Sequence, residues 1–344
     1  MTTMPATMTV PVSMVTDMLD RLGIPADEPS GAVARAGIAP ALLGRPAARV
    51  TVEQFAVFYR ALVLRYDDET PGFFTRPLRS GTLKFLCLSL LGAPTLQGAL
   101  HRFCWFFRLV LDDVRFVLHA DGRTLAIRLE ECHPLGAQRV LILELMLLLV
   151  QGVSCWLADQ RLALDRVDVA YPAPAHAGEY ANMYSGPVFF GQARTRLVFR
   201  PEARALPVRQ AQGAVSAFLR HAPVDWIRPA IGERSVSHRV RDLLQAQAAP
   251  TLSAAQVADR LHLSPRTLAR RLAAEGTRFQ ALKSAVRRDI AIARLLGTRQ
   301  PVAQIGADLG FEDPAAFNRA FRQWAGMTPG SYRQGRRSEP RHPR

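Results

Sequence analysis

Cysteine is scarce in this sequence, and its four cysteines form no metal-binding pattern. Cys87, Cys104, Cys132 and Cys155 are separated by 17, 28 and 23 positions, with no Cys-x-x-Cys pair and no histidine pair at ligand spacing. A chain of 344 residues with so few cysteines is not a disulfide-stabilised scaffold. The sequence therefore predicts buried free thiols and no metal site.

The chain also lacks a signal-peptide pattern and an uninterrupted apolar segment of membrane-spanning length. Its first residues lack the basic start and the small-residue cleavage site of a secretory signal. The most apolar run, residues 140–158, contains Glu144 and Gln151. Because a carboxylate in lipid is costly, we expect this run to be a buried core helix. These features predict a cytoplasmic protein without a membrane partner.

Patterns typical of catalysis and nucleotide binding are missing too. The sequence has neither Gly-x-Gly-x-x-Gly nor Gly-x-x-x-x-Gly-Lys. The histidines of the first two hundred residues have no serine elbow or carboxylate spacing that would indicate a triad. Asp112-Asp113 and Glu130-Glu131 could pair as acid and base, but solvated strand ends explain them more simply. We therefore predict no catalytic residue and no cofactor.

Acidic residues are outnumbered by basic ones, and the imbalance is concentrated near the end of the chain. The whole sequence has 29 Asp+Glu against 44 Lys+Arg, a net charge of +15. Residues 234–344 contain 20 basic against 8 acidic residues, whereas residues 1–233 contain 24 against 21. A basic segment attached to a nearly neutral one is typical of a phosphate-binding module.

The basic segment contains two copies of one pattern: a short helix, a tight turn and a second helix with arginines on its outer face. In the first copy, residues 253–276, Ser253 can cap one helix and Ser264-Pro265 can begin the next. In the second copy, residues 301–325, the turn is Gly310-Phe311-Glu312-Asp313 and Gly326 ends the trailing helix. Each copy predicts a helix-turn-helix unit that binds DNA.

Helical geometry assigns an outer face to each trailing helix, because residues four apart lie on the same face. Leu268 and Leu272 form the buried stripe of the first helix, and Phe317 and Phe321 form that of the second. The candidate DNA-binding residues are Ser264, Arg266, Thr267, Arg270, Arg271, Asp313, Ala315, Asn318, Arg319 and Arg322. A guanidinium can bond bidentately to guanine or neutralise a phosphate, and the sequence leaves both roles open.

Residues 236–333 resemble the C-terminal domain of the AraC/XylS family of bacterial transcription factors. Residues 305–333 contain the Leu-Gly-Phe turn of that family, its aromatic-x-x-x-Phe helix, and then its glycine, proline and Tyr-Arg positions. Lys283 to Leu296 is similar to the long helix that joins the two units. The resemblance implies an all-α domain whose two recognition helices enter successive major-groove segments, about 34 Å apart, on one side of the duplex.

The first two hundred residues predict an α+β domain. Helical spacing is found at 10–22, 51–66, 82–91, 95–110 and 136–158. Strands are predicted at 114–119 and 124–129, as a hairpin around Ala120-Asp121-Gly122, and also at 165–171 and 195–199.

Two stretches, residues 91–100 and 186–201, resemble the arabinose-binding-like N-terminal domain of one branch of the same family. That resemblance implies a domain that binds a small-molecule effector and dimerises, but it does not identify the effector. Arg102 and Arg108 flank an aromatic cluster around Phe103. Because a few polar groups in an apolar cavity usually orient a ligand, these two arginines are candidates to hold a carboxylate-bearing effector.

The predicted organisation has four parts: an effector-binding and dimerisation domain at 1–200, a connecting segment at 201–235, the DNA-binding domain at 236–335, and a disordered basic tail at 336–344. The resemblance implies an effector-responsive activator that binds double-stranded promoter DNA, with RNA polymerase and a second copy of the chain as partners. One alternative is a ligand-independent regulator whose first domain only dimerises. A more distant alternative is an enzyme fused to the same kind of DNA-binding domain.

Overall fold

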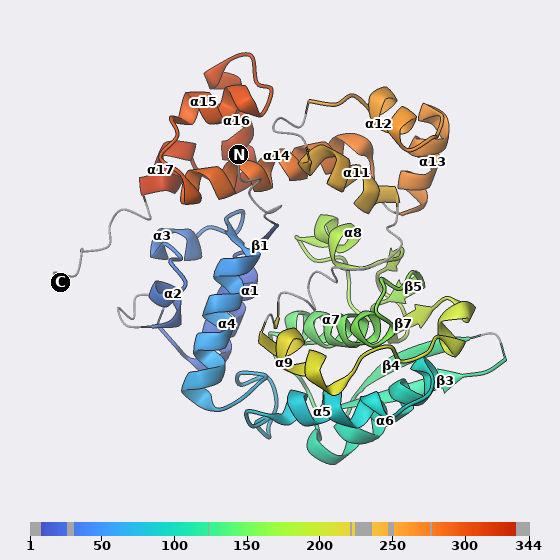
Figure 1. Cartoon of the computed structure of the whole chain (residues 1–344). Helices are drawn as coiled ribbons and strands as arrows, with labels where there is room; N and C mark the ends of the chain where they lie inside the picture. The colour runs from blue at the N-terminus through green and yellow to red at the C-terminus, as the bar shows by residue number, and fades with distance from the viewer. Residues whose placement is uncertain are drawn as a thin grey trace. The chain divides into compact units, whose positions relative to one another are not determined.

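The structure, a computed structural model, describes residues 8–25, 31–122, 124–220, 222–223, 236–246, 251–275 and 277–334. The chain divides into two compact units. A helical unit comprises residues 1–61, 238–272 and 278–344, and a sheet unit comprises residues 62–237 and 273–277. The elements of both are drawn in Figure 1. The first 61 residues thus share a unit with the last third of the chain.

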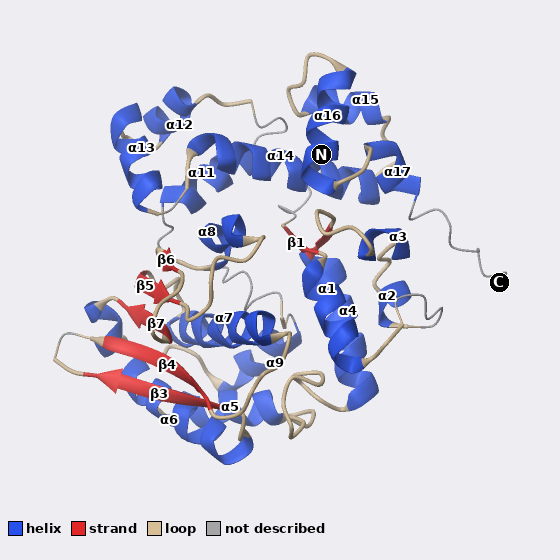
Figure 2. Ribbon diagram, turned by 180° about the vertical axis from the view of Figure 1, so that it is seen from behind, coloured by secondary structure: helices blue, strands red, loops and turns tan. Residues whose placement is uncertain are grey.

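The sheet unit is built on a five-stranded sheet with the strand order β3-β4-β7-β5-β6, shown in red in Figure 2. Its strands are β3 (Val114–Ala120), β4 (Leu125–Glu131), β5 (Leu164–Asp168), β6 (Val188–Phe189) and β7 (Thr195–Phe199). The pairs β3–β4, β4–β7 and β5–β7 are antiparallel, and β5–β6 is parallel. The predicted hairpin is confirmed as β3 and β4.

Alternating apolar residues place one face of the sheet in the core. Phe116 on β3 is buried against Phe103 and Phe107, with ring centroids 5.2 and 4.8 Å away. Both phenylalanines come from helix α6 (Leu96–Val110), which packs beside α5 (Thr82–Leu91). The Thr95 side chain caps α6 by accepting a hydrogen bond from the Gly98 amide at 3.2 Å. The aromatic cluster therefore belongs to the core.

Helix α7 (Arg139–Ala158) is long and apolar enough to cross a membrane by length and composition, but its side chains are almost all buried within the unit. The prediction of a core helix is confirmed. Glu144 is 1% exposed and accepts hydrogen bonds from the Tyr180 hydroxyl and, at 2.7 Å, from His176 Nε2 when that nitrogen is protonated. These partners offset the desolvation of the carboxylate.

The first part of the predicted connecting segment packs within the sheet unit. It forms the short helix η2 (Pro201–Ala205) and α9 (Gln212–Arg220), which contact α6 and α5 respectively. Trp156 of α7 stacks on Phe218 of α9, with ring centroids 4.7 Å apart. Residues 224–235 lie outside the described residues. The remaining elements of the unit are η1 (Ala177–Glu179) and α8 (Tyr180–Met183).

The four cysteines are free, and two of them are fully buried. Burial raises the pKa of Cys87 to about 12 and that of Cys155 to about 11. Cys104 is partly buried and Cys132 is exposed. The expectation of buried thiols was wrong for Cys132, because this residue follows the last residue of β4 and lies in the loop beyond the sheet.

The N-terminal part of the helical unit begins with a small two-stranded sheet. Strand β1 (Thr9–Pro11) pairs antiparallel with β2 (Arg49–Thr51). Between and after them lie α1 (Ser13–Leu22), α2 (Ala32–Arg35), α3 (Pro40–Leu43) and α4 (Val52–Tyr66). The helix predicted from residue 10 begins instead at Ser13, because residues 9–11 form β1. The boundary between the two units falls inside α4.

The C-terminal part of the helical unit is all-α, as predicted. Its helices are α11 (Val236–Gln245), α12 (Ala254–Arg260), α13 (Pro265–Ala274), α14 (Phe279–Gly297), α15 (Val302–Asp308), α16 (Pro314–Ala325) and α17 (Pro329–Gln334). Helix α14 runs between the pair α12 and α13 at one end and the pair α15 and α16 at the other (Figure 1). Gly276 and the predicted tail at 336–344 lie outside the described residues.

Candidate nucleic-acid interface

The first helix-turn-helix unit consists of α12 and α13, and local side-chain hydrogen bonds define both helix starts. Ser253 and Gln256 form a capping box at α12, in which each side chain bonds the other residue's backbone amide. The Ser264 hydroxyl accepts a hydrogen bond from the Thr267 amide at 3.1 Å, at the start of α13. Leu268 and Leu272 are 1% and 0% exposed, so the opposite face of α13 is open to solvent.

The second unit consists of α15 and α16 and is built in the same way. The Asp313 carboxylate caps α16 by accepting hydrogen bonds from the amides of Ala315 and Ala316 at 2.9 and 3.2 Å. Phe317 and Phe321 are fully buried. At Gly306 on α15, an added Cβ would lie 2.9 Å from Cγ of Phe317. Glycine at this position therefore allows the two helices to pack closely.

Each of the two helix-turn-helix turns has one residue in the left-handed region of backbone conformation, His262 at φ +56° and Gly310 at φ +79°. This backbone conformation costs a non-glycine residue about 1–2 kcal/mol. We expect His262→Gly to raise the free energy of unfolding by about 1 kcal/mol, and Gly310→Ala to lower it by at least that amount. Urea unfolding of each variant, with an unchanged m-value, would test this pair. Destabilisation by His262→Gly would show that contacts of the imidazole outweigh the backbone strain.

Five of the predicted DNA-binding residues are arginines with exposed side chains: Arg266, Arg270, Arg271, Arg319 and Arg322. Among the described residues, none of them pairs with a carboxylate. Other arginines of the same unit are paired, such as Arg241 with Asp289 at 3.1 Å and Arg294 with Asp308 at 2.7 Å. The outer faces of α13 and α16 therefore present cationic donors that no described acidic side chain neutralises.

The other predicted residues have mostly local partners. Ser264, Thr267 and Asp313 form the helix caps, because their oxygens bond backbone amides or each other at the helix starts. Asn318 Nδ2 donates to the Pro314 carbonyl at 2.9 Å within α16. Ala315 is exposed. A DNA contact by any of the ten residues stays a prediction.

Helix α14 fixes the spacing of the two helix-turn-helix units, α12–α13 and α15–α16. Its 19 residues correspond to a length of about 28 Å at 1.5 Å per residue. At its C-terminal end, Arg294 bonds Asp308 of α15, and hydrogen bonds from Gln300 and Gln304 lower the pKa of the Asp308 carboxyl below its usual value. These contacts anchor the second unit to α14.

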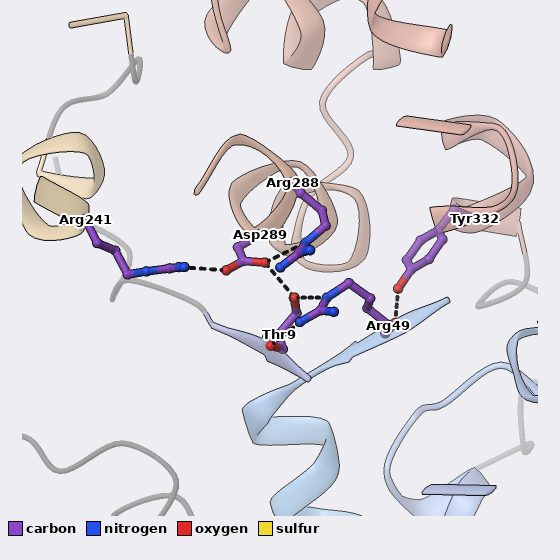
Figure 3. A network of polar contacts seen from close by, with 6 residues as sticks. All are labelled: Thr9, Arg49, Arg241, Arg288, Asp289 and Tyr332. Atoms are coloured by element: carbon purple, nitrogen blue, oxygen red, sulfur yellow. Dashed lines mark hydrogen bonds and ion pairs between the residues drawn. The ribbon is translucent and has the colours of Figure 1, made fainter. Parts of the chain in front are cut away.

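A buried polar network joins the N-terminal segment to α14 (Figure 3). Asp289 on α14 is 1% exposed, and its Oδ1 accepts a hydrogen bond of 2.6 Å from the Thr9 hydroxyl of β1. Its Oδ2 accepts from Nη1 of Arg241 on α11 at 3.1 Å. One carboxylate thus bridges three segments that are far apart in the sequence.

Arg49 of β2 completes this network. Its Nε donates to Thr9 Oγ1 at 2.7 Å and its Nη2 to the Thr9 carbonyl at 2.8 Å. The Tyr332 hydroxyl of α17 donates to the Arg49 carbonyl. All five of these network contacts are buried, so β1 and β2 are an integral part of the unit that contains both helix-turn-helix pairs. No motif in the sequence indicated these residues.

The two predicted effector-binding arginines lie on the exposed side of α6. Arg102 donates from Nη1 and Nη2 to the carbonyls of Ser89 and Gly92, both at 3.0 Å, and so holds the end of α5. The Arg108 guanidinium lies over the Trp105 ring, 5.0 Å from its centroid. Binding of an effector by either residue stays a prediction.

Two helix-turn-helix units on a shared helix, in a chain that also contains an α+β sheet unit, define a transcription regulator of the AraC type. The family described as the arabinose-binding domain of AraC transcription regulator, N-terminal, matches residues 28–208, more than half of the chain. A helix-turn-helix domain family matches residues 257–335. The chain therefore belongs to the AraC family of transcription regulators, in the branch with an arabinose-binding-type N-terminal domain.

Similar proteins are also named as transcription regulators. The ornithine utilization regulator of Pseudomonas aeruginosa is 33% identical over 226 residues, which cover 66% of this chain and 64% of that protein. The HTH-type transcriptional regulator VirS of Mycobacterium tuberculosis is 46% identical over 81 residues, 24% of each chain. The chain thus spans less than two thirds of the length of these relatives. Their names give no support to the enzyme alternative.

Among solved structures, the transcriptional regulator CdpR from Pseudomonas aeruginosa is 25% identical to this chain. The similarity covers 72% of this chain and 81% of that one, with a TM-score of 0.28. A score this low does not support a structural comparison.

Proposed function

We propose that this protein is a sequence-specific DNA-binding regulator of transcription that binds a bipartite promoter site. The supporting observation is the pair of helix-turn-helix units at the two ends of α14, each with exposed arginines that have no carboxylate partner among the described residues. The length of α14, about 28 Å, is close to the spacing of about 34 Å between successive major-groove segments on one side of the duplex. One polypeptide then contacts two half-sites.

Within this proposal, α13 and α16 are the recognition helices. Their caps, centred on Ser264 and Asp313, fix where each helix begins, and the arginines on the outer faces contact base edges or phosphates. Arg266 and Arg319 lie in the N-terminal half of their helices, the part that enters the major groove in helix-turn-helix proteins. They are the first candidates for contacts with bases.

The sheet unit supplies the response to a small-molecule effector, in a cytoplasmic activator that contacts RNA polymerase. An effector can act only through different affinities for two states of the protein. Residues 28–61 belong both to the segment matched by the arabinose-binding family and to the helical unit. This overlap supports a route in which effector binding alters the contact of β1 and β2 with α14. The name of the ornithine utilization regulator makes amino acids the first effectors to test.

A second copy of the chain is the proposed partner of the sheet unit. Phe85 on α5, and Trp105 and Leu109 on α6, are 66%, 51% and 73% exposed. Large apolar side chains that are exposed on two packed helices are typical of an interaction surface. Because Trp105 and Leu109 are one helical turn apart, they lie on the same face of α6 and supply a continuous apolar strip for self-association.

Footprinting of the full-length protein on the DNA that flanks its own gene, at several salt concentrations, tests the function. Two protected major-groove segments about one helical turn apart, stable at moderate salt, are expected. Diffuse protection that salt abolishes would contradict sequence-specific binding to that DNA. Thermal unfolding against a metabolite panel then separates the effector-responsive regulator from the ligand-independent one, because a ligand at 100 times its Kd stabilises its domain by about 2.7 kcal/mol.

A further inference from the structure

The face of the sheet opposite α6 contains a small basic cavity. Its volume is about 140 Å³, and it is lined by Val117, His119, Ala126, Arg128, Arg194 and Arg196. All six residues come from β3, β4 and β7 or from the residue just before β7, so the cavity lies wholly within the sheet unit. Two of the lining residues are apolar and the other four are histidine or arginine. Among the lining residues there is no carboxylate.

The register of the sheet brings two of these arginines directly together. Arg128 of β4 pairs with Val117 of β3 on one side and with Arg196 of β7 on the other. Directly opposite residues in an antiparallel pair have Cβ atoms about 4.5–5.5 Å apart, and like charges in this position are destabilising. Two guanidinium groups in the middle of a sheet face therefore require negative charge nearby.

The protein provides only part of that negative charge. Glu130 bonds Arg128 and lies 3.9 Å from Arg115. The single negative charge of Glu130 is thus shared between Arg115 and Arg128, so the guanidinium of Arg128 is incompletely neutralised. Its Nε is also buried without a hydrogen-bond partner. This donor has no acceptor in the part of the chain that the structure describes.

The same shortage is found on the other side of the cavity. The Asp168 side chain, 4% exposed, bonds both Arg196 and Arg166, at 2.7 and 2.6 Å. Arg194 is exposed and has no carboxylate partner among the described residues. The cavity is therefore lined by three arginines, and the carboxylates that bond Arg128 and Arg196 are each shared with an arginine that does not line it.

We propose that this cavity binds a small anion through a carboxylate or phosphate group, and that this anion is the effector of the regulator, an assignment that rests on the proposed function. Guanidinium groups present paired N–H donors that match the oxygens of both groups. A cavity of about 150 Å³ holds benzene, a ligand of six heavy atoms. The size of this cavity therefore suits inorganic phosphate or a short dicarboxylate rather than a nucleotide.

Isothermal titration of the full-length protein without DNA tests the site, with inorganic phosphate and succinate as separate probes. Saturable binding of at least one probe is expected, and the tighter one identifies the anionic group. Arg194→Gln and Arg128→Gln should each raise Kd tenfold or more. Arg115→Gln is the matched control, because Arg115 lies on the same face of β3 but does not line the cavity. It should leave Kd within twofold of the parent value.

Absence of saturable heat with both probes at millimolar concentration overturns the proposal, as does an equal loss of affinity in Arg115→Gln. If Arg128→Gln does not fold, the exposed Arg194→Gln decides the result. A short DNA duplex serves as a third titrant: binding of DNA that Arg194→Gln weakens, without binding of either small anion, would assign this face to nucleic acid and reject the anion site. Failure of the proposed regulator function would give a different result: the protein would still bind the anion but would protect no segment of DNA in the footprinting experiment.

Discussion

Replacement of Asp289 by alanine is expected to lower the free energy of unfolding of the helical unit by about 3–5 kcal/mol. The substitution removes the acceptor shared by Thr9 and Arg241 and leaves the buried Arg241 guanidinium, 4% exposed, without this counter-charge. Removing one partner of a buried ion pair is more costly than the loss of a surface ion pair, which is worth about 0–1 kcal/mol. Urea unfolding followed by circular dichroism measures the change.

Two further variants make this measurement specific. Asp289→Asn keeps an acceptor for the Thr9 hydroxyl but removes the charge, so an intermediate loss of stability is expected. Asp112→Ala removes a carboxylate from an exposed ion pair, in which Arg76 and Asp112 are 51% and 58% exposed. It should change stability by no more than about 1 kcal/mol. If Asp289→Ala were equally mild, the network of Figure 3 would not hold β1 against α14 in solution.

The second large effect is expected on DNA binding. Arg266→Ala and Arg319→Ala should each cost about 1–3 kcal/mol on the cognate site if both side chains contact bases. Because the two residues lie in separate helix-turn-helix units, their effects should add to about 2–6 kcal/mol in the double variant, a loss of affinity between about 30-fold and 2 × 10⁴-fold. Fluorescence anisotropy on the footprinted site and on random DNA, at one salt concentration, measures both losses.

Arg299→Ala is the matched control for this experiment. Arg299 is exposed and lies between α14 and α15, outside both recognition helices. Its replacement removes the same charge but should weaken binding only slightly, and equally on both DNAs. A double variant that loses the same affinity on random DNA as on the cognate site would show that Arg266 and Arg319 contact phosphates only.

The helix-turn-helix units were predictable because their signals are local. Ser253, Ser264 and Asp313 each cap the helix that follows them by bonding backbone amides two or three residues away, and Gly310 marks its own turn. The β3–β4 hairpin was predictable for the same reason, since alternation and a turn are both short-range patterns. Strands β1 and β2 were missed, because three residues are too few to show alternation.

Features that depend on distant pairing could not be predicted. Arg128 and Arg196 meet only because β4 pairs with β7, and two other strands separate these in the sequence. The sequence predicts Arg102 and Arg108 as effector candidates because they are close in sequence to Phe103 and Phe107. In the helix those phenylalanines face the core while both arginines face solvent, so proximity in sequence does not show which face of a helix a residue occupies.

The hydrogen bond between Thr9 and Asp289 also limits the order in which parts of the chain can fold during synthesis. The two residues are 280 positions apart, so at a synthesis rate of about 5–20 residues per second the N-terminal strands wait on the order of 10–60 s for α14. Until then, the buried side chains of residues 9–51 have no partner from the DNA-binding helices. A chain that ends before residue 279 would lack α14 altogether and expose that segment to proteases. The proposed binding to DNA therefore requires a chain that has been synthesised through α14.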